Sequence, residues 1–210
     1  MTLFRSILAI LLLTYLGSAS AAVRHPLDGL QAEEYLAVRD ILVASGDADN
    51  TTLFAMIRLD EPPKAEVLAW TSGSKIPRVA WVVLRKGERM FEARVDLDAG
   101  KPLSVDEVDN AQSSILDSEF TAAEKVVEAD PGWREAMRKR GYKNIDPDQF
   151  MCAPLAAGYF AEPQFEGRRI VRAQCFDLKG TKKNVFQRPI SGLTVVVDLN
   201  QNTVLELSLI

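Results

Sequence analysis

The segment Phe91-Glu92-Ala93-Arg94-Val95-Asp96-Leu97-Asp98 decides the fold, because its apolar and charged side chains alternate strictly. Such alternation is typical of an antiparallel strand with one buried face and one solvated face. The end of this segment recurs 102 positions later, where Val197-Asp198-Leu199-Asn200 repeats Val95-Asp96-Leu97-Asp98. In both copies a polar turn and a short apolar segment follow. This repetition predicts a duplicated domain with a repeat of about 100 residues, and not a solenoid of short repeats.

A helical stripe precedes the strands in each copy, at residues 31–44 in the first and 120–127 in the second. Asp130 and Pro131 predict an N-cap and a first helical position for a further short helix. The strand-like runs are 52–59, 66–70, 78–85 and 90–97 in the first copy, and 169–176, 193–199 and 204–209 in the second. This order predicts an α+β protein of two tandem cystatin-like domains, each a helix packed on an antiparallel sheet. We place the domains at residues 23–112 and 113–210.

Residues 1–22 have the pattern of a cleavable signal peptide. Arg5 provides a positive start, an apolar run spans Ile7 to Leu16, and Ala19 to Ala21 form an Ala-x-Ala site. The apolar run is shorter than the roughly 20 residues that a bilayer span needs. We therefore expect a secreted or periplasmic protein that has no membrane association after cleavage.

The composition excludes some classes of partner and leaves the cysteine chemistry open. The formal net charge is −4 with both signs interspersed, whereas a nucleic-acid-binding protein would show a basic stripe. Export makes a disulfide possible between Cys152 and Cys175, the two cysteines of the chain. Free thiols and a metal pair are the alternatives, although two thiolates without histidine partners make a poor zinc site.

Several motifs, taken in order along the chain, resemble the two small N-terminal domains, N2 and N3, of copper amine oxidases. In the first copy these are His25–Leu30, Leu59–Lys64 and Pro77–Ala80. In the second copy they are Lys139–Gly141, Met151–Leu155, Gly158–Phe160, Cys175–Phe176, Lys179–Thr181 and Arg188–Leu199, which are similar to the plant-type branch. The resemblance extends over roughly residues 24–204, and its specificity lies in the order and spacing of the motifs.

The resemblance implies a structural role for this chain. Members of the family oxidise primary amines to aldehydes, with release of ammonia and hydrogen peroxide, in a catalytic domain that follows N2 and N3. That domain holds copper on three histidines and a topaquinone made from the tyrosine of an Asn-Tyr-Asp/Glu motif. This chain has one histidine, His25, and none of its tyrosines follows an asparagine. We therefore expect no catalytic, cofactor-binding or metal-binding residues here. Copper and topaquinone are implied only for the missing catalytic domain.

The plant-type branch also carries a disulfide at positions that match Cys152 and Cys175, and the resemblance implies the same pairing here. Two features depart from the family. Gln31 stands where the family usually places a Ser or Thr helix cap, which predicts a weaker cap. Residues 205–210 end in a strand where family members continue into the catalytic domain.

The histidine, the tryptophans, a basic cluster and three aspartates are each interpreted as structural rather than functional. We expect His25 to be a helix-entry residue and Trp70, Trp81 and Trp133 to lie in the cores. The basic residues Arg134, Arg138, Lys139, Arg140 and Lys143 are interpreted as a solvated helix end. Asp96, Asp98 and Asp106 lack the spacing and the closing glutamate of a calcium loop.

Two hypotheses of function remain. The first is that the chain is the non-catalytic N-terminal region of a copper-dependent primary-amine oxidase, and that it packs against a catalytic domain or subunit. The alternative is a freestanding exported binding module without enzymatic activity, because a helix on an antiparallel sheet often serves binding. Neither hypothesis assigns a reaction to the chain itself.

Overall fold

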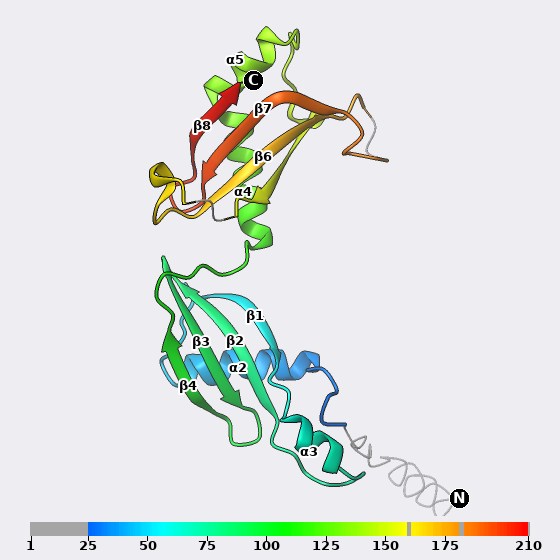
Figure 1. The fold of residues 1–210 in the computed structure, drawn as a ribbon, viewed down its shortest axis with the longest axis vertical. Helices are drawn as coiled ribbons and strands as arrows, with labels where there is room; N and C mark the ends of the chain where they lie inside the picture. Colours follow the sequence, from blue (N-terminus) through cyan, green and yellow to red (C-terminus); the bar gives the residue numbers. More distant parts are fainter. Residues whose placement is uncertain (1–24, 159–160, 181–182, 210) are drawn as a thin grey trace, which may run out of the picture.

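The computed structural model describes residues 25–158, 161–180 and 183–209. They form two domains that lie end to end, and the second domain contains the C-terminal strand (Figure 1). The predicted signal peptide, residues 1–22, lies outside the described residues. No helix in the described part of the chain is both long enough and apolar enough to cross a bilayer.

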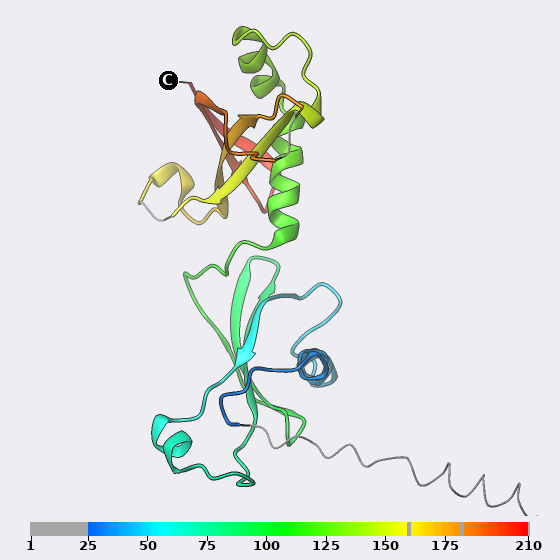
Figure 2. The ribbon, with the colours of Figure 1, turned by 90° about the vertical axis from the view of Figure 1, so that its right-hand side faces the viewer.

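The first domain is a four-stranded antiparallel sheet with a helix across one face. Its elements are α2 (Ala32–Ala44), β1 (Leu53–Leu59), α3 (Lys64–Ala69), β2 (Val79–Lys86), β3 (Arg89–Asp96) and β4 (Lys101–Glu107). The strands are ordered β1-β2-β3-β4. Figure 2 looks along the axis of α2, which stands beside the sheet. Val38 and Leu42 from α2 are fully buried against the sheet residues Ala80, Val82 and Leu84.

The second domain repeats this plan. Its elements are α4 (Asp117–Ala129), α5 (Pro131–Lys139), β5 (Phe150–Ala156), β6 (Ile170–Asp177), β7 (Pro189–Asp198), β8 (Thr203–Leu209) and two 3-10 turns, Pro147–Gln149 and Pro163–Phe165. The sheet order is β5-β6-β7-β8, and α4 contacts all four strands. Asp130 caps α5 as predicted, since its carboxylate accepts a hydrogen bond from the Trp133 N–H at 2.7 Å.

The register of the strands shows that the two sheets are copies. Val79 pairs with Asp96 at the start of the β2–β3 ladder, and Ile170 pairs with Asp198 at the start of the β6–β7 ladder. The repeated Val-Asp-Leu sequence thus ends the third strand of each domain. The predicted class, two tandem α+β domains with a helix on an antiparallel sheet, is confirmed.

Some predicted elements are wrong. Residues 66–70 are not a strand, because Lys64–Ala69 form helix α3, whose Ala, Glu and Leu residues are good helix formers. Strands β4 and β5 were not predicted, since each contains a proline that interrupts its pattern. Both are edge strands, where a missing backbone donor is tolerated.

Of the three tryptophans expected in the cores, one is there. Trp133 is 1% exposed, whereas Trp81 is partly exposed under the guanidinium of Arg58, 4.3 Å from its ring centre. Trp70 is also partly exposed, and its indole N–H donates to the carbonyl of Ser74 at 2.9 Å. The indole N–H of Trp70 and the ring face of Trp81 both have interaction partners at the surface. The sequence pattern does not distinguish such partly exposed tryptophans from buried ones.

The two domains are joined by the segment between the end of β4 at Glu107 and the start of α4 at Asp117. The boundary placed between residues 112 and 113 falls within this segment and stays a prediction. The segment contributes to the junction described below.

Leu84→Ala should destabilise the first domain by about 2–5 kcal/mol, because Leu84 is fully buried and its truncation leaves a cavity. Leu68→Ala is the matched control, since Leu68 on α3 is 75% exposed, and its effect should stay within about 0.5 kcal/mol. Urea unfolding monitored by circular dichroism measures both. Equal effects of the two substitutions would contradict the burial pattern.

Candidate functional site

Each domain helix begins with the same carboxylate arrangement. The third helical residue is Glu34 in α2 and Glu119 in α4. Each carboxylate accepts a hydrogen bond from the backbone N–H of the N-cap residue, Gln31 at 2.7 Å and Leu116 at 2.8 Å. The Gln31 side chain makes no capping bond, as expected from its departure from Ser or Thr. The glutamates therefore satisfy a free backbone donor that the N-cap side chains do not.

An arginine at the start of the second strand binds the glutamate of the first domain. Arg78 precedes β2 and pairs with Glu34 through Nε and Nη2, the latter 2.9 Å from Oε2. Its Nη2 also donates to the carbonyl of Gly29 at 2.8 Å. The hydrogen bond to Glu34 raises the pKa of Arg78, because it favours the charged guanidinium. Arg78 thus connects the helix, the segment before it and the sheet.

The second domain has the same connection with deeper burial. Arg169 precedes β6, and its Nε and Nη2 lie 2.7 Å from the two oxygens of Glu119. It also donates to the carbonyls of Ser113 and Ser114, each at 2.9 Å. The Arg169 and Glu119 side chains are only 4% and 8% exposed. A charge buried to this degree needs both pairing and hydrogen bonds, and here it has both.

The repeated Val-Asp-Leu sequence completes each connection from the other side. The Leu97 N–H donates to the carbonyl of Arg78 at 2.9 Å, and the Leu199 N–H donates to the carbonyl of Arg169 at 2.8 Å. The end of the third strand therefore fixes the backbone of the arginine that binds the helix. We call the two sets Glu34–Arg78 and Glu119–Arg169 the helix clamps.

The first domain adds a second arginine to the helix clamp of the second domain. Arg85 lies near the end of β2, and its Nη1 donates to Glu119 Oε1 at 2.5 Å. Two further hydrogen bonds are found nearby: Asn200 Nδ2 donates to Glu88 Oε1 at 3.0 Å, and Gln112 Nε2 donates to the carbonyl of Arg168 at 3.0 Å. The tip of the β2–β3 hairpin thus contacts the start of α4 and the β7–β8 turn.

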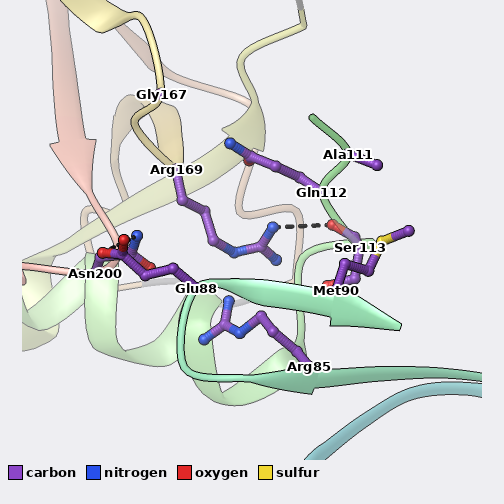
Figure 3. Close-up of a pocket in the computed structure, with 9 residues that line it drawn as sticks. All are labelled: Arg85, Glu88, Met90, Ala111, Gln112, Ser113, Gly167, Arg169 and Asn200. Atoms are coloured by element: carbon purple, nitrogen blue, oxygen red, sulfur yellow. Dashed lines mark hydrogen bonds between the residues drawn. The ribbon is translucent and has the colours of Figure 1, made fainter. Parts of the chain in front are cut away.

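A small cavity of about 40 Å³ lies at this junction, between Arg85 and Met90 of the hairpin and Arg169 and Asn200 of the second domain (Figure 3). Arg85 Nε is buried here, and no described residue accepts its hydrogen bond. The volume is enough for one or two water molecules and too small for an organic substrate. This cavity is therefore part of a structural contact and not a substrate pocket.

The shared carboxylate stays ionised over a wide pH range. Burial alone would raise the pKa of Glu119, but hydrogen bonds from Arg169, from the Leu116 N–H and from Arg85 outweigh it and lower the pKa to about 2. The ion pairs at the domain junction therefore remain charged at neutral and moderately acidic pH.

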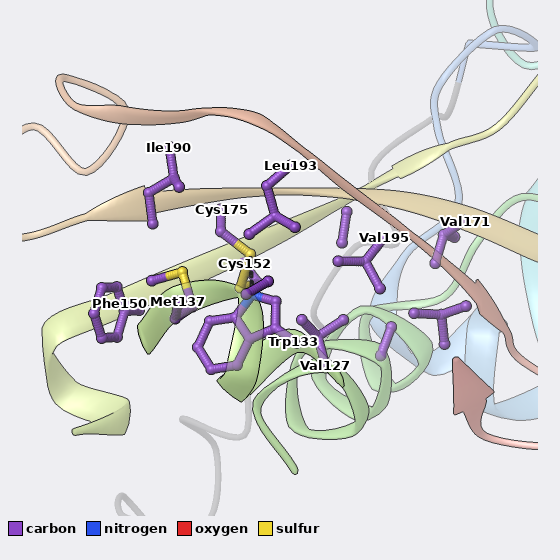
Figure 4. Close-up of a cluster of buried hydrophobic side chains, with 14 of the residues drawn as sticks. Val127, Trp133, Met137, Phe150, Cys152, Val171, Cys175, Ile190, Leu193 and Val195 are labelled. Atoms are coloured by element: carbon purple, nitrogen blue, oxygen red, sulfur yellow. Dashed lines mark hydrogen bonds between the residues drawn. A yellow bond between two sulfur atoms is a disulfide. The ribbon is translucent and has the colours of Figure 1, made fainter. Parts of the chain in front are cut away.

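Cys152 and Cys175 lie opposite each other on β5 and β6 and are joined by a disulfide. Both are fully buried, and the Trp133 indole N–H donates to Cys175 Sγ at 3.3 Å. Figure 4 shows the disulfide between the helices and the strands, beside Trp133 and Met137. The disulfide is part of the core of the second domain.

The other residues considered from the sequence have structural partners. The His25 ring packs edge-on against Trp70, with 5.0 Å between the ring centres, and the backbone N–H of His25 donates to the Asp28 carboxylate. Among the basic residues, Arg138 forms an ion pair with Glu135, and Arg140 donates a hydrogen bond to the carbonyl of Gly192. Within the described residues, no three His, Cys, Asp or Glu side chains are arranged to hold a metal ion.

Sequence reasoning did not find Glu119, Arg169 or Arg85. A signal was present, because Glu34 and Glu119 are both third in their helices and Arg78 and Arg169 both precede their strands. This signal can be recognised only when the first and last residues of the helices and strands are known. For Arg85, no such repeat exists, since the residue at the same distance along β6, seven positions after Arg169, is Phe176.

Comparison with known proteins places both domains in one group. Residues 25–108 match the family model "Copper amine oxidase, N2 domain", and residues 118–209 match "Copper amine oxidase, N3 domain". Copper-containing amine oxidase gamma 1 of Arabidopsis thaliana is 36% identical over 87% of this chain and 26% of its own length. Histamine oxidase of Arthrobacter globiformis is 31% identical over 88% of this chain and 27% of its own length.

A solved structure shares the fold. The copper-containing benzylamine oxidase of Hansenula polymorpha matches with a TM-score of 0.74 and 14% identity, over 89% of this chain and 30% of that one. The chain thus spans about a quarter of the length of the two curated relatives described above.

The low pKa of Glu119 predicts a pH dependence of stability. Because its folded pKa, about 2, lies below the ordinary value of 4.5, the stabilisation is complete above pH 4.5 and is lost as the pH falls towards 2. The total is on the order of 3 kcal/mol. Glu119→Gln should be less stable at pH 7 and should lose less stability between pH 4.5 and 2. Urea unfolding across this range measures the effect. Glu135→Gln, in an exposed pair, is the control and should follow the wild type.

Replacing Cys152 and Cys175 together by alanine should lower the melting temperature of the second domain. The disulfide spans 23 residues, and closing such a loop contributes about 3 kcal/mol in the chain-entropy model. Calorimetry of the double variant measures the loss. A count of two free thiols in the native protein would contradict the disulfide.

Proposed function

We propose, because this chain belongs to the copper amine oxidase family through its N2 and N3 domains, that it forms the non-catalytic N-terminal part of a copper-dependent primary-amine oxidase. The observation that carries the proposal is coverage: the two domain matches include nearly all described residues, yet the matched region is only about a quarter of the length of the relatives. The oxidation of amines to aldehydes belongs to the catalytic domain of such an enzyme.

The side chains of this chain support the assignment of the oxidation to a separate catalytic domain. Copper in this family needs three imidazoles, and the chain has a single histidine. Topaquinone needs a tyrosine after an asparagine, and none of the four tyrosines has one. The residues present do not fit copper or the quinone, and no step of the oxidation is assigned to them.

The outer face of α2 is the surface proposed to pack against the catalytic domain. Leu36 and Val43 lie two helical turns apart and are 54% and 48% exposed, and Tyr35 beside them is 41% exposed. The exposed ion pair of Arg39 and Asp40 lies between the two turns. A surface helix normally carries polar residues on its outer face, whereas a helix that is apolar on several sides is usually covered. The catalytic part of the family's polypeptide supplies an occupant of sufficient size.

The proposed location is outside the cytoplasm, in the periplasm or the extracellular medium. The motivation is the positive, apolar and small-residue pattern of residues 1–22, together with the cysteine pair that an oxidising compartment suits. Mass spectrometry of the protein from the culture medium or periplasm would test this, with a mature start at residue 22 or 23 expected. An intact N-terminus in the cytoplasmic fraction would contradict it.

The docking proposal predicts that the chain binds a catalytic domain of the family and is inactive alone. With copper and a primary amine, the chain alone should release no hydrogen peroxide. Mixed with a catalytic domain that lacks its own N2 and N3, it should sediment as a 1:1 complex in analytical ultracentrifugation. Leu36→Lys should weaken the complex at least tenfold by burying an unpaired charge, roughly the effect of 1.4 kcal/mol.

Ser72→Lys is the control, because it adds the same charge at an exposed polar site on another loop. Peroxide release by the chain alone would contradict the proposal. A monodisperse, cooperatively melting chain that does not bind the catalytic domain would favour the freestanding binding module.

A further inference from the structure

We infer that Arg85 is a latch that holds the two domains in one fixed orientation. It is the side chain by which the β2–β3 hairpin of the first domain reaches the buried carboxylate of Glu119 at the start of α4 in the second. Figure 3 shows Arg85 at this junction, near Arg169. The inference concerns a fixed relation between the domains and holds whether or not a catalytic domain binds them.

The duplication separates this role from the folding of either domain. In the first domain one arginine, Arg78, joins the helix to the sheet through two nitrogens, and in the second domain Arg169 does the same. One arginine is thus enough for a helix clamp. Arg85 is additional to the clamp of the second domain and comes from a different domain, so its contribution is to the junction.

Burial makes the latch effective. Arg85 is 14% exposed and Glu119 is 8% exposed, so their ion pair is screened less by solvent and salt than a surface pair. Glu119 is itself held by Arg169 and by the Leu116 N–H. The acceptor that Arg85 meets is therefore already positioned, and little side-chain entropy is lost on the Glu119 side.

The rest of the junction is small. The other described hydrogen bond from the hairpin is Glu88 with Asn200, which is exposed. The connecting segment is bound to the second domain through Gln112 and through the Ser113 and Ser114 carbonyls, which accept from Arg169, but these hydrogen bonds do not involve the hairpin of the first domain. Domains with so limited a contact are expected to move relative to each other unless a specific interaction prevents it. Among the described residues, the Arg85–Glu119 pair is the buried ion pair that joins the hairpin of the first domain to the second domain.

Distance measurements between spin labels on the two domain helices test the latch. The native cysteines are in the disulfide, so Ala44→Cys on α2 and Lys125→Cys on α4 provide specific, exposed labelling sites. With Arg85 intact, pulsed electron paramagnetic resonance should give one narrow distance distribution. Arg85→Ala should broaden it, and protease cleavage within residues 108–116 should accelerate on the order of tenfold, as expected for the loss of a charged hydrogen bond.

Arg89→Ala is the matched control. Arg89 lies in the same hairpin and pairs with Glu107 of its own domain, so its removal deletes the same charge without touching the second domain. It should leave the distances and the cleavage rate unchanged. Arg85→Lys keeps the charge without the planar fork and should give an intermediate result.

Circular dichroism establishes that both domains of each variant remain folded. If Arg85→Ala impairs folding, Arg85→Gln replaces it, since glutamine keeps a polar donor but lacks the charge and the length of the guanidinium side chain. An unchanged, narrow distribution in folded Arg85→Ala or Arg85→Gln would overturn the inference. So would equal broadening by Arg89→Ala, which would assign the effect to the hairpin itself.

Discussion

The pairing of a buried glutamate at the start of each domain helix with an arginine at the start of the second strand is the interaction on which the architecture depends. A carboxylate in this position accepts from the backbone N–H of the N-cap residue, and the arginine compensates its charge. Because a guanidinium and a carboxylate meet in a defined planar geometry, the pair fixes where the helix starts relative to the sheet. Apolar contacts alone would allow the helix to slide along it.

The duplicated plan could be predicted from the sequence because its signal is local. The alternation around Val95 and its repetition around Val197 both lie within single strands, where side-chain period is set by backbone geometry. The prediction was wrong where local signals conflict, as in Lys64–Ala69, a short helix with apolar residues that also suit a strand. It missed β4 and β5, two of the four edge strands, because their prolines break the pattern that identifies strands.

The candidate site could not be predicted in the same way because its members are distant in sequence. Arg78 and Glu34 are 44 residues apart, and Arg169 and Glu119 are 50 apart. Charged residues at the ends of elements are usually solvated, so nothing in the composition distinguishes these four from the other charged residues of the chain. Arg85 was still less visible, since it looks like an ordinary charged residue at the end of a strand. Only the packing of one domain on the other gives it a buried partner.

The unequal ends of the two repeats have a consequence for assembly. The residue of β6 that corresponds to Arg85 is Phe176, whose ring packs edge-on against Phe186. A contact between unlike surfaces, if repeated, would add copies without limit and produce open filaments. At this described position of β6, an aromatic ring stands in place of the guanidinium that the contact requires. The two repeats therefore differ at the position that joins the domains, and the phenylalanine cannot form the same ion pair with a further copy.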